Sequence, residues 1–80
     1  MTAVMPLLLA PEGSLVRIIE VRGGHGLIRR LAEIGIFPGR TLHVVTSSRG
    51  PVVIEMHGNG SSSKIALGCG VAMKILVEVS

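Results

Sequence analysis

The side chains able to hold a metal ion are few and scattered along this chain. His25, His43, His57 and Cys69 are the ligand types, and they show neither C-x-x-C nor H-x-x-x-H spacing. His43 and His57 fall on segments expected to be neighbouring strands, so the fold could bring them together. Tight binding needs three or four converging ligands. We therefore predict no built metal site within the chain, and weak transition-metal binding stays an alternative.

Side chains that could carry out acid–base or nucleophilic catalysis are equally few. The chain has no Asp, and its five Glu, at positions 12, 20, 33, 55 and 78, are dispersed rather than paired. Cys69 stands between two glycines without an activating neighbour in sequence, and a buried, inert thiol is expected there. We predict that the protein is not an enzyme and needs no cofactor.

Two glycine-containing stretches superficially resemble phosphate-binding loops. Gly24-His25-Gly26 precedes a helical pattern, but Arg29 stands where a dinucleotide fingerprint needs its third glycine. Residues 58–64 end in Lys64 without the glycine before it and the hydroxyl residue after it that a P-loop requires. Both stretches are therefore predicted to be polar turns.

The basic residues offer a surface rather than a catalytic group. Arg29 and Arg30, with Arg22 nearby, could form a basic face, although a net charge of +3 fits an ordinary solvated helix equally well. Phe37 is the single aromatic residue, and Trp and Tyr are absent. The chain thus lacks a stacking platform for single-stranded nucleic acid and an aromatic groove for proline-rich peptides.

The elements that must position these residues are mainly strands. Ten Val and eight Ile, with eleven Gly for turns, favour a small β fold in this chain of 80 residues. We expect a single domain, with residues 1–12 as a lead-in and 13–79 as the core. One cysteine and the lack of a membrane-length apolar stretch predict a cytoplasmic protein.

The periodicity of hydrophobic residues predicts five strands and one helix. Strands are predicted at residues 15–21, 42–45, 52–57, 62–67 and 74–79. An amphipathic helix over 27–34 is expected to end at Gly35 and to pack its Leu/Ile stripe on the sheet. A type II turn is predicted at 37–40, a hairpin turn at 58–60 and a helical turn at 71–73. Leu7-Leu8-Leu9 would add an edge strand or cover one.

This order of elements predicts an SH3-like five-stranded barrel with one short helix inserted after the first strand. In it the helix and the following turn would project Arg29, Arg30, Glu33 and Phe37, which we interpret as a partner-binding surface. The alternative for Phe37 is a plug at the end of the barrel.

The segment around the helix also resembles a known family. Arg30-Leu31-Ala32-Glu33-Ile34, followed by Gly35-Ile36-Phe37-Pro38-Gly39, is similar to the RRL-x-E-[LI]-G-[IL]-x-P-G signature of the ferrous iron transport protein A (FeoA) family. The first strand at 13–18, the hairpin at 44–54 and the ending at 66–77 also resemble the family pattern. The similarity spans about residues 12–79. Cys69 departs from the pattern, since that place is often basic or polar.

The resemblance implies an SH3-like barrel with a helical insertion, in a small cytosolic accessory protein of Fe²⁺ uptake. It implies a protein–protein role with the membrane GTPase-permease FeoB, with no nucleic acid partner and contact with the membrane only through the permease. Two alternatives stay open: a free-standing regulatory or nucleic-acid-binding module, and a metal sensor related to the C-terminal domain of DtxR-type repressors. A homo-oligomer also stays open, since residues 1–11 could exchange an edge strand between protomers.

Overall fold

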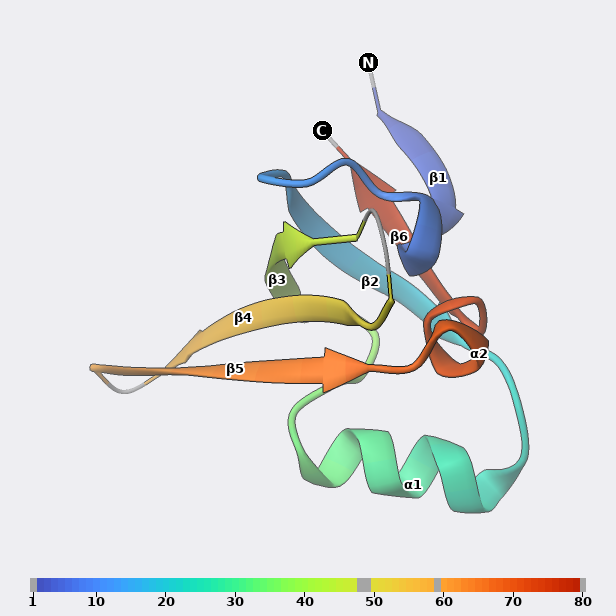
Figure 1. The fold of residues 1–80 in the computed structure, drawn as a ribbon. Coiled ribbons are helices and arrows are strands. Elements are labelled where there is room, and N and C mark those ends of the chain that lie inside the picture. The colour runs from blue at the N-terminus through green and yellow to red at the C-terminus, as the bar shows by residue number, and fades with distance from the viewer. Residues whose placement is uncertain (1, 48–49, 59, 80) are drawn as a thin grey trace.

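The β-branched segments form one antiparallel sheet in the computed structural model, which describes residues 2–47, 50–58 and 60–79 (Figure 1). The strands are β1 (Ala3–Pro6), β2 (Leu15–Val21), β3 (Thr41–Thr46), β4 (Val52–Gly58), β5 (Ser61–Leu67) and β6 (Ile75–Val79). Their order in space is β1-β6-β2-β3-β4-β5. The predicted mainly-β, SH3-like class is confirmed, with six strands in the described residues instead of five.

The additional strand is β1, in the segment that we expected to be a lead-in. It pairs with β6 in the register Ala3↔Val79 to Pro6↔Leu76. Its four residues are all apolar and show no alternation, and what holds the strand is its pairing with β6 near the other end of the chain. Consequently α1 (His25–Glu33) follows the second strand, whereas the sequence predicts a helix after the first.

The three leucines after β1 do not form the edge strand that was one of our expectations. They form a short 3-10 helix, η1 (Leu7–Leu9), which places Leu7 fully in the interior. Ala10 is buried beside it, so this segment contributes two side chains to the core. A 3-10 turn achieves this because it sends neighbouring side chains in different directions.

The core is built from alternate residues of the central strands. In β2 and β6, burial falls on Val16, Ile18, Ile75 and Val77, while their sequence neighbours are more exposed. Val52, Ile54 and Met56 repeat this pattern in β4. Sixteen apolar side chains make up the buried cluster, and no polar or charged side chain of the described residues is buried. The interior therefore contributes stability and leaves any function to the surface.

The end of α1 confirms the predicted glycine cap. Gly35 has φ +97°, and its N–H donates to the carbonyl of Ala32 at 3.0 Å. The Ile36 N–H donates to the carbonyl of Leu31 at 2.8 Å, and the two bonds together form a Schellman motif. Ile36 is fully buried, so the motif fixes the helix end to the core.

The predicted turn at 37–40 is also confirmed. Gly39 has φ +95°, and the Arg40 N–H donates to the Phe37 carbonyl at 3.2 Å. The turn is held against β2, because Gly39 donates to the Ile18 carbonyl and Ile18 to the Arg40 carbonyl, both at 2.8 Å.

The remaining turns complete the chain. A second helix, α2 (Cys69–Ala72), lies close to the predicted helical turn and precedes β6. The predicted hairpin turn joins β4 to β5, where Gly58 pairs with Ser61; Asn59 itself lies outside the described residues. Within the described part of the chain, no helix is long and apolar enough to cross a membrane.

Candidate partner-binding site

Helix α1 lies to one side of the sheet and keeps much of its surface in solvent (Figure 1). Leu31 is its only buried residue. Leu27 is half-buried, and Ile34, just beyond the helix, is 45% exposed. The prediction that the whole Leu/Ile stripe packs on the sheet is therefore wrong: Leu31 is buried and Leu27 packs partly against the core, whereas Ile34 at the end of the stripe stays exposed.

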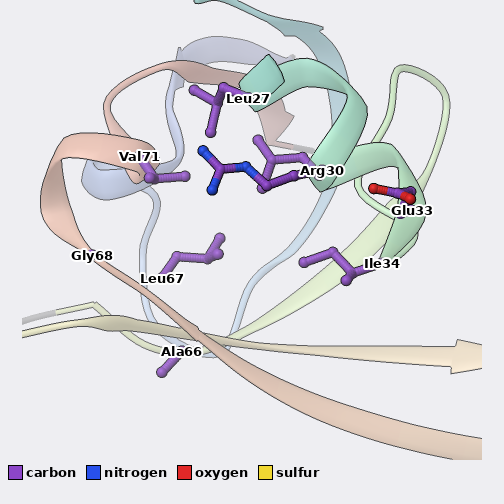
Figure 2. Close-up of a pocket in the computed structure, with 9 residues that line it drawn as sticks. Leu27, Arg30, Glu33, Ile34, Ala66, Leu67, Gly68 and Val71 are labelled. Atoms are coloured by element: carbon purple, nitrogen blue, oxygen red, sulfur yellow. The ribbon is translucent and has the colours of Figure 1, made fainter. Parts of the chain in front are cut away.

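The uncovered side of α1 borders an open groove of about 630 Å³ (Figure 2). Its other wall is the end of β5 and the start of α2. The apolar lining consists of Leu27, Leu31, Ile34, Ala66, Leu67 and Val71. Arg30, Glu33 and Gly68 complete it. A mostly apolar groove with a few charged groups is the usual composition of a binding site.

Among the four predicted partner-binding residues, Arg30 and Glu33 line this groove. In Figure 2 the Arg30 side chain extends across the groove between Leu27 and Val71, whereas Glu33 lies towards the other end beside Ile34. Arg29 is exposed but does not line the groove. The two adjacent arginines therefore lie in different surroundings. Arg22, the third arginine of the expected basic face, pairs instead with Glu20 at 3.4 Å.

Phe37, the fourth predicted residue, lies on the turn after α1 and is 41% exposed. The neighbouring Ile36 is the side chain that fills the core. The Arg40 guanidinium carbon lies 6.0 Å from the centre of the Phe37 ring, and Arg40 also donates to the His57 carbonyl at 3.3 Å. The ring thus lies at the surface beside Arg40, where a partner can reach it.

The metal-ligand types are placed in three different regions. His25 begins α1, and Cys69 begins α2. His43 and His57 do come near each other across β3 and β4, through Glu55: its Oε1 lies 3.8 Å from His43 Nδ1 and 3.5 Å from His57 Nε2. In the described ranges, no group of three His, Cys, Asp or Glu side chains is arranged so that it could hold a metal ion.

Cys69 differs from expectation in its burial. We predicted a buried thiol, but the side chain is exposed, with its Sγ 3.5 Å from the Gly50 carbonyl oxygen. Its position as the first residue of a four-residue helix keeps it outside the core, and Ala72 at the other end takes the buried place.

The far wall of the groove was missed by the sequence analysis. Leu67 and Val71 appear in the sequence as ordinary core residues of a strand and a helical turn. In the structure Leu67 is buried and Val71 half-buried, and both face α1 from a segment about 40 positions along the chain. Periodicity alone carries no signal for such an arrangement.

Comparison with known proteins identifies the group to which this architecture belongs. The FeoA domain family model matches residues 5–79. A relative from Methanocaldococcus jannaschii, which carries the provisional name Fe(2+) transport protein A, is 42% identical over 73 residues, which cover 91% of this chain and 84% of the relative. The match shows the family resemblance inferred from the sequence to be correct.

Solved structures agree with this assignment. A crystal structure described as the iron uptake regulatory protein FeoA superposes with a TM-score of 0.85 at 29% identity, covering 98% of this chain and 100% of that one. A manganese-dependent transcriptional repressor superposes with a TM-score of 0.78 at 18% identity, through 44% of its length, which shows a shared fold alone. The domain match and the 42% identical relative establish that this chain belongs to the FeoA family of ferrous iron transport accessory proteins.

Proposed function

We propose that this protein assists Fe²⁺ import by docking, without catalysis of its own, on the membrane GTPase-permease FeoB. The docking surface comprises Arg29, Arg30, Glu33 and Phe37. One observation carries the proposal: α1 and its following turn leave Ile34 45% and Phe37 41% exposed, close in sequence to two arginines. Aromatic and arginine side chains dominate the binding energy of protein interfaces, so this combination favours a partner surface.

The alternatives have weaker support. A nucleic-acid interface would need a stronger positive field than a net charge of +3, and its binding would weaken steeply with salt. A metal sensor would need converging ligands, whereas His43 and His57 are brought together only through one carboxylate. The likeness to the manganese-dependent repressor concerns the fold and adds nothing to either.

The proposal is tested by co-purification with the detergent-extracted permease. Arg29→Ala combined with Phe37→Ala should weaken binding by roughly 30-fold or more, because hot-spot truncations lose about 2 kcal/mol or more. Both side chains are exposed, so the variant should fold normally. Circular dichroism checks this.

The matched control is Arg17→Ala combined with Leu15→Ala. It removes one exposed arginine and one exposed apolar side chain from β2, outside the docking surface. We expect this control to retain permease binding. Undiminished binding by the Arg29/Phe37 variant, or an equal loss in the control, would refute the proposed surface.

A further inference from the structure

The groove beside α1 differs from an ordinary surface hollow because the apolar stripe of an amphipathic helix forms one of its walls. Leu27, Leu31 and Ile34 follow helical spacing, yet only Leu31 is buried. An apolar stripe that the rest of the protein covers only in part is typical of a surface covered by another molecule. Leu67 and Val71 extend the same apolar surface on the opposite wall.

Arg30 defines the charge that such a molecule must carry. Its side chain extends over the apolar lining between Leu27 and Val71 (Figure 2). The Arg30 guanidinium takes part in none of the ion pairs and side-chain hydrogen bonds found between described residues. A partner that covered it without supplying a carboxylate would leave a buried, unpaired charge, which is strongly unfavourable.

Glu33 determines the orientation in which a partner segment can bind. It lies three positions further along the chain, about 4.5 Å along the helix axis, and lines the other end of the groove. A complementary partner segment therefore carries its acidic side chain opposite Arg30 and a neutral or basic one about a turn away. The apolar side chains of that segment meet residues 27, 31 and 34, whose spacing matches the ridges of a second helix.

From these contacts we infer that the groove between α1 and the β5–α2 junction binds an amphipathic helix of a partner protein, whose apolar face carries a carboxylate that pairs with Arg30. The inference rests on the proposed function, which is docking on a partner protein. It adds the kind of partner segment that binds in the groove. A second copy of this chain and an extended peptide along β5 are the competing occupants.

The test uses the full chain and two synthetic peptides. The first is an acetylated amphipathic helix with leucines at i, i+3, i+4 and i+7, a glutamate beside the leucines of one turn and a glutamine beside those of the next; the second has a lysine in place of the glutamate. Amide shifts in two-dimensional NMR titrations give both the affinity and the site. We expect at least about tenfold tighter binding of the acidic peptide, with shifts concentrated at residues 27–34 and 66–71.

Two charge-reversal variants separate a local ion pair from the overall charge. Arg30→Glu should reverse the preference in favour of the lysine peptide. Arg17→Glu makes the same change in net charge on β2, outside both the groove and the docking surface, and should preserve the preference for the acidic peptide. Equal effects of the two variants, or a wild-type protein without preference, would overturn the inference.

The remaining outcomes also decide between the occupants. Concentration-dependent shifts of the groove amides in the absence of peptide would assign the groove to a second copy, and shifts confined to β5 would assign it to an extended segment; either result overturns the inference.

The permease assay distinguishes a failure of this inference from a failure of the proposed function. If peptide binding follows Arg30 but the wild-type protein fails to co-purify with the permease, the groove chemistry holds and the proposed function fails. If Arg30→Glu loses the acidic peptide but binds the permease undiminished, the inference fails and permease docking stands.

Discussion

The same chemical change, Gly→Ala, should have opposite effects at the two ends of α1. Gly35 ends the helix with φ +97°, a left-handed conformation that costs an L-residue about 1–2 kcal/mol. A Cβ there would lie 3.5 Å from Met56 Sδ, an ordinary contact that adds no steric penalty. Gly35→Ala should therefore lower the free energy of unfolding by about 1–2 kcal/mol.

Gly26 is the matched control within the same helix. It has no positive φ, and nothing lies within 4 Å of the position of an added Cβ. Alanine loses less backbone entropy than glycine in a helix, so Gly26→Ala should raise the free energy of unfolding by roughly 0.5–1 kcal/mol. The two variants should differ from each other by about 1.5–3 kcal/mol in total.

Thermal unfolding followed by far-ultraviolet circular dichroism measures both effects. At about 4–8 °C per kcal/mol for a domain of this size, the two Tm values should lie on opposite sides of the wild-type value. Gly35→Asn should fall between the wild type and Gly35→Ala, because asparagine tolerates the left-handed region better. Shifts of equal sign at positions 26 and 35, or a neutral Gly35→Ala, would refute the capping argument.

Three further predictions concern the core, the turn and the sheet surface. Ile54→Ala should lower the free energy of unfolding in urea by about 2–5 kcal/mol, because Ile54 is fully buried; a loss below about 1 kcal/mol would contradict this. Arg40→Ala should lower it by roughly 1 kcal/mol through loss of its bond to a β4 carbonyl and its contact with Phe37, and a neutral effect would argue against those contacts. A double-mutant cycle on Arg17 and Glu78, 2.8 Å apart and solvent-accessible, should give about 0.2–1 kcal/mol that declines with salt; coupling that is independent of salt would count against an exposed ion pair.

Local signals in the sequence were sufficient for most of the fold. The helix cap at Gly35, the turn at Gly39 and the central strands follow from residue preferences within a few positions. Strand β1 could not be predicted in the same way, because Ala3–Pro6 is held by pairing with the last strand of the chain. Such non-local pairing leaves no periodic pattern in a segment of four residues.

Only the α1 part of the candidate site could be predicted from the sequence. The helix pattern indicated that Arg29, Arg30 and Glu33 lie on the surface of α1, but it also implied that the apolar stripe is covered. Whether a stripe is covered depends on where the sheet lies relative to the helix, which is a property of the tertiary structure. Only the tertiary structure shows that Leu67 and Val71 form the opposite wall of a groove. It also shows that Arg30 lines this groove and Arg29 does not.

Photocrosslinking in cells tests the docking surface most directly. Phe37 is replaced by the photoreactive p-benzoylphenylalanine, which retains its ring and its exposed place on the turn, and Leu15 on β2 is replaced in the same way as the control. We predict a crosslinked product containing the permease from position 37 and none from position 15. Crosslinking from position 15 alone, or equally from both, would contradict docking through α1 and its turn.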